Sequence, residues 1–301
     1  MAINTSSLTA YVGDNKEKLI SKAVIGAKSA SKFNLVTGVK GAQKLNLLDT
    51  TVVLQDGSAC GWTEAGTSKL SQRTIEAKPI KVNQEFCDKQ LLATSLNYEV
   101  KVAAGQKTLP FEEDFVNGVM DGIAAEVEKT IWQGDTSKST LNRFDGLIKI
   151  LSGATLAGTY SIQSGDTVST IVSKTYALIP SAAFEAGNVV MYMGSDMYRT
   201  WIQELIANGH LVISNAVEDV AMPDSLLIPG TNVRVEGVAG LDGTKKVYAS
   251  YADNFVFGTD MQGDEEKADL WYSQDNRSFR LAVEFVAGVQ VAFPELVAVA
   301  K

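Results

Sequence analysis

The sequence predicts an α+β fold built from one long helix and several long strands. Residues 109–133 carry apolar side chains at a four-residue spacing, which is typical of an amphipathic helix: Phe115, Val119, Ile123, Val127 and Ile131. Residues 279–293 alternate with the two-residue period of a strand. Residues 50–86 read as two extended segments around a glycine-rich turn. At their full lengths the helix would span about 35 Å and the last strand about 50 Å.

The N-terminal region is predicted to be an extended polar arm, residues 1–13, followed by a short amphipathic helix. That helix is expected from Asp14 to about Ser29, because Asp14 can cap it and Leu19, Ile20, Ala23 and Val24 share one face. The long helix 109–133 has Pro110 near its start, three acidic residues in its first turn and Gly134 as a stop. Gly118 and Gly122 should make it bendable.

The return segment of residues 50–86 changes phase at a proline. Apolar residues occupy odd positions as far as Pro79, and even positions from Ile80 through Val82 to Phe86. Such a change predicts a bulge, or a strand that passes from one environment into another.

The second half of the chain is predicted to mix two further helices with strands. The helices are residues 167–179, ended by Pro180, and residues 196–208, followed by Gly209. The strands are expected at residues 189–193, 233–235, 247–251, 255–257 and 270–272.

Charge and composition limit the class of protein. The chain has 301 residues, 45% of them hydrophobic, and a net charge of -8 from 27 basic and 35 acidic side chains. Reading nucleic acid requires a basic face, so such a role is not expected, although an acidic wall could still confine DNA. No export signal or bilayer-spanning segment is recognised. Cys60 and Cys87 form no CxxC pair, which favours a reducing cytoplasm over a disulfide scaffold.

Motifs that could carry chemistry are weak throughout. The single histidine, His210, rules out a His-rich metal site, and no GxSxG motif accompanies it. Residues 134–140 lack the glycine that precedes the lysine of a phosphate loop and follow a helix instead of a strand. Residues 260–266 do not match an EF-hand and are expected to form a solvated turn, with a divalent cation at a subunit contact as the lesser alternative. The tryptophans fall on four different predicted elements and are expected to be core or interface anchors: Trp62, Trp132, Trp201 and Trp271. We therefore expect no catalytic residue, cofactor or metal site, and no enzymatic activity.

The order of these elements resembles the Hong Kong 97 fold of tailed-phage major capsid proteins. Seven stretches carry the resemblance. Residues 61–70 and 75–82 are similar to the extended loop and its return, and residues 126–135 and 144–149 to the end of the spine helix and the turn that follows it. Residues 188–198 are similar to an axial-domain strand and helix, and residues 253–259 and 279–293 to the closing strands. The resemblance implies an N-terminal arm (1–33), a peripheral domain (34–49 and 87–180) with a spine helix (109–133), an extended loop (50–86), an axial domain (181–270) and a long C-terminal strand that returns to the peripheral domain (271–301).

The resemblance further implies a structural protein that assembles as hexamers and pentamers into the icosahedral head around phage dsDNA. The extended loop would then lie over a neighbouring subunit, with contacts expected at Trp62, Glu64, Lys69 and Arg73. The arm would reach across ring boundaries, and residues 206–224 would approach the ring axis. Implied partners are the portal, a separate scaffolding or decoration protein, and packaged dsDNA by non-specific contact, with no membrane. The location would be the virion capsid, assembled in the bacterial host cytoplasm.

Two features depart from relatives of that family. The chain has no room for the long, cleaved N-terminal scaffolding segment that some of them carry, so we expect a scaffold in trans or none. The lysine and asparagine pair that a few relatives cross-link cannot be assigned.

Three alternatives remain open at this point. An encapsulin nanocompartment would share the fold and would be distinguished by an enzyme cargo in place of DNA, portal and scaffold. An intracellular enzyme or ligand-binding protein would need convergent polar groups in a pocket. A tail or neck protein more often lacks the order of long loop and long helix.

Overall fold

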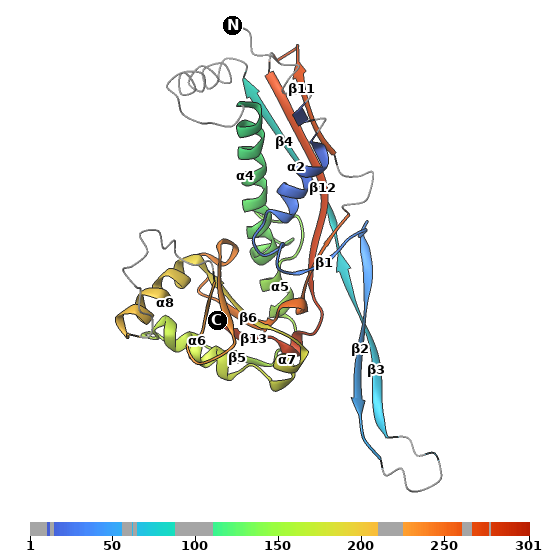
Figure 1. Ribbon diagram of the computed structural model, residues 1–301. Coiled ribbons are helices and arrows are strands. Elements are labelled where there is room, and N and C mark those ends of the chain that lie inside the picture. Colours follow the sequence, from blue (N-terminus) through green and yellow to red (C-terminus); the bar gives the residue numbers. More distant parts are fainter. Residues whose placement is uncertain are drawn as a thin grey trace.

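The computed structural model describes residues 11–12, 15–55, 62, 65–87, 111–209, 225–260, 267–276 and 278–301. These residues form two sheets with helices packed on them, and a two-stranded hairpin that projects from the first sheet (Figure 1). The mixed helix and sheet content agrees with the predicted α+β class.

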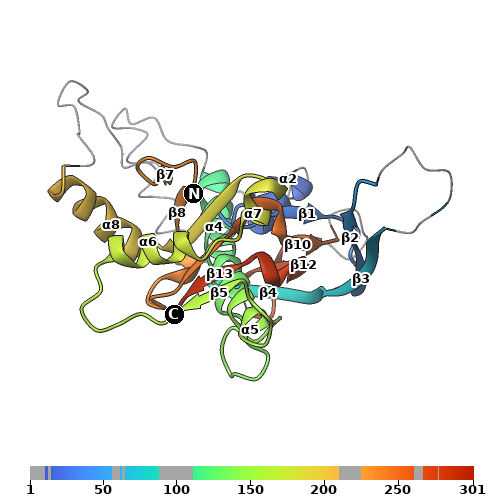
Figure 2. The ribbon, with the colours of Figure 1, turned by 90° about the horizontal axis from the view of Figure 1, so that it is seen from below.

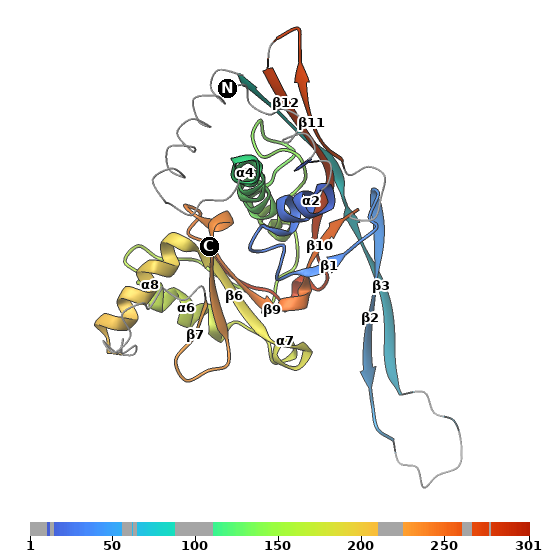
Figure 3. The ribbon, with the colours of Figure 1, turned by 45° about the horizontal axis from the view of Figure 1, so that its top comes forward.

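The first sheet is organised by the long strand β12 (Ser278–Val291). Along one edge β12 pairs antiparallel with β4 (Lys78–Cys87), and along the other with β10 (Phe255–Thr259) and β11 (Lys267–Ser273). β1 (Asn34–Val36) adds to β10 in parallel. Helices α4 (Phe111–Gln133) and α2 (Lys16–Ile25) lie side by side against this sheet (Figures 1 and 3).

The predicted long helix and long strand are both confirmed. Ile123, Val127 and Ile131 of α4 are buried, and so is every odd-numbered residue of β12 from Phe279 to Val291, as the two periods require. At about 3.3 Å per residue the strand is about 46 Å long. The prediction for residues 14–29 was too long: α2 has Asn15 at its N-cap position without a side-chain capping bond, and Asp14 is outside the described residues.

The second sheet has the strand order β5-β13-β9-β6-β8-β7. Its strands are β5 (Gly158–Tyr160), β13 (Ala298–Ala300), β9 (Val247–Tyr251), β6 (Val189–Gly194), β8 (Arg234–Val238) and β7 (Ser225–Leu227). Helices α6 (Val168–Ala177), α7 (Ser181–Ala186) and α8 (Ser195–Ala207) share its hydrophobic core. α6 therefore packs with this sheet, although it falls in the 87–180 range that the sequence assigns to a peripheral domain.

Short elements complete the chain. α5 (Leu147–Ser152) packs against α4 and β12. Three 3-10 turns connect the strands of the second half: η1 (Ala239–Leu241), η2 (Ala252–Asn254) and η3 (Pro294–Leu296). The sequence did not predict α5, α7, β1, β5, β7 or β13, all of which have six residues or fewer.

A buried polar network joins the segment after α2 to the end of α4. The backbone N–H and the Oγ of Ser29 donate to the two carboxylate oxygens of Glu128 over 2.8 and 2.6 Å. The Trp132 indole N–H donates to Ser29 Oγ over 2.7 Å. All three residues are almost fully buried, and burial raises the pKa of Glu128, although the two Ser29 hydrogen bonds oppose the rise. The network fixes this segment against α4 where the two sheets meet.

Candidate self-association surface

The projecting hairpin is largely exposed where its side chains are described. β2 (Ala42–Val52) and β3 (Gly66–Glu76) pair antiparallel from Ala42 opposite Glu76 to Val52 opposite Gly66. The hairpin extends away from both sheets, as Figures 1 and 2 show from two directions. Most of its described side chains are exposed or half-buried. A two-stranded hairpin is only marginally stable alone in water, so packing against a further surface would stabilise this one.

The base of the hairpin is anchored in a small core of its own. Six buried residues form that core: Val39, Ile75, Ala77, Val256, Val286 and Ala292. Two segments of the chain cross closely there, since a Cβ on Gly288 of β12 would collide with the Glu76 carbonyl oxygen. The Gln290 side-chain amide also donates to the Thr74 carbonyl over 2.7 Å. The hairpin is thus joined to the first sheet at its base and free of the subunit beyond it.

The strand changes partner at the base, as the phase change at Pro79 predicted. β3 pairs with β2 and ends at Glu76, whereas β4 begins at Lys78 and pairs with β12 over its whole length. Pro79 stands opposite Val286 in that ladder, a place that proline tolerates because β4 is an edge strand in the described sheet. The hairpin runs from Ala42 to Glu76, so it begins and ends earlier than the predicted loop 50–86, and residues 78–87 belong to the first sheet instead.

Large apolar side chains are exposed toward the tip. Their exposed fractions are 74% for Val52, 52% for Val53, 94% for Leu54 and 95% for Trp62. We call these four residues the tip apolar group. Contiguous exposed apolar surface is typical of an interaction site, so this group is a candidate contact.

The four contact residues expected from the sequence fall in or near this hairpin. Trp62 belongs to the tip apolar group. Arg73 is half-buried and stands opposite Leu45, while Lys69 stands opposite Asp49 in the register. Glu64 is outside the described residues. Their role as contacts with another subunit stays a prediction.

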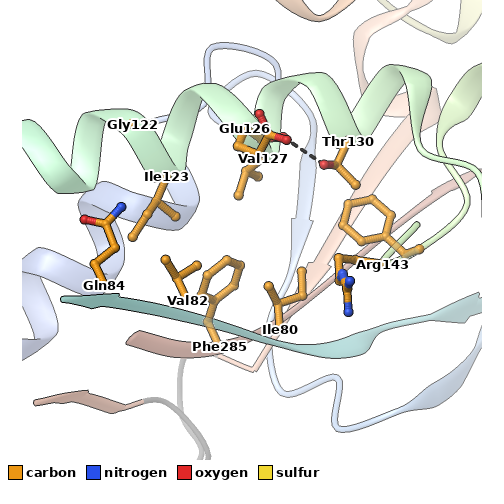
Figure 4. A pocket seen from close by; sticks show the side chains of 11 residues that line it. Ile80, Val82, Gln84, Gly122, Ile123, Glu126, Val127, Thr130, Arg143 and Phe285 are labelled. Carbon is orange, nitrogen blue, oxygen red and sulfur yellow. Dashed lines mark hydrogen bonds between the residues drawn. The ribbon is translucent and has the colours of Figure 1, made fainter. Parts of the chain in front are cut away.

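A second apolar feature, which the sequence did not reveal, lies between α4 and the first sheet. It is a cavity of about 230 Å³, which we call the helix–sheet groove (Figure 4). Its lining comes from α4, from the two paired strands and from the turn after α4: Gly122, Ile123, Glu126, Val127, Thr130, Ile80, Val82, Gln84, Phe285, Arg143 and Phe144. Side chains from four separate chain segments meet there, because β4 pairs with β12 and α4 packs over that pair.

The loop after α4 is occupied by its own charges and is not a phosphate site. The Lys149 ammonium lies 2.7 Å from Asp135 Oδ1 and 2.9 Å from Asp145 Oδ1. The backbone N–H groups of Thr136 and Ser137, which a phosphate would need, donate to Asp145 and Asp135 instead. The Lys149 hydrogen bond, with that from Ser137, lowers the pKa of Asp135 to about 2.

The other residues singled out in the sequence form no common site. Trp132 and Trp201 are buried, whereas Trp62 and Trp271 are exposed, so the four tryptophans make no cage. His210, Cys60 and residues 261–266 are outside the described residues; Asp260 is buried, and Cys87 is a free, exposed thiol. Within the described ranges, no group of three acidic, histidine or cysteine side chains could hold a metal ion. No helix there has the length and apolar character needed to cross a membrane.

Comparison with known proteins gives a match in structure and none in sequence. No family model matches the chain, and no curated protein matches it either. Among solved structures, a chain of the satellite phage P4 procapsid that includes the size-determination protein Sid aligns with a TM-score of 0.64 at 10% identity. The alignment covers 100% of this chain and 98% of the procapsid chain.

Two further structures are similar to the chain. A virus-like particle from Pyrococcus furiosus aligns with a TM-score of 0.54 at 10% identity and covers 100% of both chains. A chain of Gordonia phage Cozz aligns with a TM-score of 0.56 at 12% identity and covers 91% of this chain and 86% of that one. At such low identities the alignments establish the fold over nearly the whole chain, and the fold alone.

Proposed function

Because the chain has the fold of phage capsid proteins, we propose that it is a major capsid protein that assembles as hexamers and pentamers into an icosahedral head around dsDNA. One observation carries the proposal beyond the fold: a projecting hairpin with a tip apolar group that has no core within the subunit. Shell subunits can supply that core to one another through heterologous contacts that close around an axis.

The extended loop of the proposed subunit is the β2–β3 hairpin, with Trp62, Glu64, Lys69 and Arg73 as its contacts. Residues 1–33 are its arm and α4 its spine helix. Proposed partners are the portal, a scaffolding or decoration protein and packaged dsDNA. The net charge of -8 favours a wall that confines DNA without binding it tightly. The proposed location is the virion capsid, after assembly in the bacterial host cytoplasm.

A specific observation supports a second candidate, an encapsulin-like compartment. The virus-like particle from Pyrococcus furiosus aligns with the chain over the full length of both. The two candidates differ in contents and partners. Particles that take up DNA and pair with a portal would favour the phage head, whereas particles that hold a co-purifying enzyme would favour the compartment.

The first experiment is expression of the full chain, followed by size-exclusion chromatography and negative-stain electron microscopy. Closed shells, or regular rings of five and six, are expected alone or on addition of scaffold or phage lysate. The matched variant replaces residues 53–65 with Asn-Gly. Because Val52 and Gly66 are register partners, a two-residue turn can close the ladder. This variant should keep the circular dichroism of the parent and form no shells. Normal shells from it, or a parent that never assembles, would contradict the proposal.

A further inference from the structure

Two asparagines of the chain are followed directly by glycine, and they stand in very different surroundings. Asn117 precedes Gly118 inside α4, whereas Asn208 precedes Gly209 at the end of α8. In such a pair the backbone nitrogen of the glycine can attack the side-chain amide carbon of the asparagine, because glycine has no side chain that obstructs the approach. The attack also requires the backbone between the two residues to turn. Local structure therefore decides which of the two pairs can react.

Asn117 is held by its helix and by a neighbouring side chain. α4 continues from this position to Gln133, so the peptide unit between Asn117 and Gly118 is fixed by helical hydrogen bonds on both sides. The side chain is half-buried, and its Oδ1 accepts a hydrogen bond from the Lys22 ammonium over 3.1 Å. The nitrogen of Gly118 is thus kept away from the amide carbon, and this pair should react slowly.

Asn208 is exposed and ends its helix. α8 lies far from the hairpin, beside the second sheet (Figures 1 and 2). Asn208 is its C-cap residue, with φ of -85° and ψ of 1°, and Gly209 follows with φ of 71°. The Gly209 N–H donates to the Ile206 carbonyl over 3.0 Å. Helix ends fray at little cost in free energy, and opening this last-turn bond frees the nitrogen for attack.

We propose that Asn208 is a site of spontaneous deamidation, with water as the co-reactant. The Gly209 nitrogen bonds to Cγ of Asn208, the Cγ–Nδ2 bond breaks, and the amide nitrogen leaves as ammonia with the proton that the Gly209 nitrogen gives up. Water then opens the cyclic imide at either of its carbonyls and leaves aspartate or isoaspartate at position 208. Each event replaces a neutral amide by a carboxylate. The reaction does not depend on the proposed function.

The new carboxylate stands at an unfavourable place. The C-terminal end of a helix carries partial negative charge, so an anion there destabilises the last turn. Glu204 lies four residues before Asn208, and like charges at that spacing on a helix repel each other. The Glu204 carboxylate accepts the N–H groups of Val168 and Ser169 over 3.0 and 2.7 Å at the start of α6. Deamidation should therefore loosen the contact between α8 and α6.

Mass spectrometry of the aged full chain tests the site. The native chain is incubated in mildly alkaline buffer made with water enriched in a heavy oxygen isotope, because base favours the attack and the label enters only when water opens the imide. Digestion in ordinary water and liquid chromatography then separate the peptides with asparagine, aspartate and isoaspartate. Labelled product at Asn208 should exceed that at Asn117 by at least about tenfold.

The same chain in urea is the matched control, because both Asn-Gly pairs are then unfolded and should react at similar rates. Equal labelling of Asn117 and Asn208 in the native chain, or a native Asn208 that stays unlabelled, would overturn the proposal. Asn208→Gln should abolish labelling at position 208, since the larger ring that glutamine must form closes far more slowly. Labelling of that variant at the rate of the parent would also overturn it.

Asn208→Asp tests the consequence of the new charge, with Asn208→Gln as the neutral control. Amide hydrogen exchange should show roughly threefold lower protection of Val168 and Ser169 in Asn208→Asp than in Asn208→Gln. Equal protection in the two variants would overturn the effect on the α8–α6 contact, and the labelling experiment decides the modification itself.

Discussion

Replacing the buried Ser29 with alanine should destabilise the subunit far more than the loss of a hydroxyl on the surface would. Ser29 Oγ donates to Glu128 Oε1 over 2.6 Å and accepts from the Trp132 indole over 2.7 Å, with all three residues buried. Above the raised pKa of Glu128, where its carboxylate is ionised, the hydrogen bond to it contributes about 1.5–3 kcal/mol, and the neutral bond from Trp132 about 0.5–1.5 kcal/mol. The backbone hydrogen bond of residue 29 to Glu128 remains. We therefore expect the free energy of unfolding to fall by about 3 kcal/mol.

Urea denaturation of the full chain, at a concentration where it is not assembled, measures this loss by tryptophan fluorescence and circular dichroism. Ser31→Ala is the matched control, because Ser31 Oγ donates only to the exposed Lys28 carbonyl. That control should change the free energy of unfolding by no more than about 0.5 kcal/mol. A loss below about 1 kcal/mol for Ser29→Ala, or equal losses for the two variants, would refute the reasoning.

Two further predictions concern pH. The pKa of Glu128 is raised above 4.5 chiefly by burial, so the folded state resists losing that proton, and the contribution of Glu128 to stability falls as pH rises from 4.5 through the raised pKa. Glu128→Gln should remove this fall, which unfolding curves of both proteins across that pH range would measure. The same pH dependence of the free energy of unfolding in both proteins would contradict the effect of burial. Lys149→Met should raise the pKa of Asp135 from about 2 toward its ordinary 3.8, because the lysine hydrogen bond is the largest cause of the shift. Carboxyl NMR titration would measure it, with Lys138→Met, whose ammonium lies 3.7 Å from Asp135, expected to change it less. A pKa that stays near 2 in Lys149→Met would contradict the assignment.

The sequence revealed the elements whose pattern is local and long. The helix 111–133 and the strand 278–291 each bury one face over many residues, so their periods stand out. The phase change at Pro79 likewise showed a change of partner, because the buried face of a strand follows its environment. These features were sufficient to predict the mixed fold class and the order of the longer elements.

The sequence did not predict other elements, because their residues show no helical or strand period. Residues 298–300 are buried on both sides and three residues long, so they show no alternation. The start of β2 at Ala42 was missed because the exposed first strand has little apolar contrast. The Ser29–Glu128 pair joins positions 99 residues apart. The helix–sheet groove likewise depends on pairings that no single segment encodes.

The shared strand at the hairpin base also has a mechanical consequence. Residues 66–87 run from the tip into the first sheet with only Ala77 outside a strand, and the last ten of them are paired with β12. In an antiparallel ladder the hydrogen bonds lie perpendicular to the strands, so a pull along this segment loads all of them in shear together. Tension applied at the tip would therefore be spread over the longest strand of the subunit, whereas a pull across the ladder would open its bonds one after another.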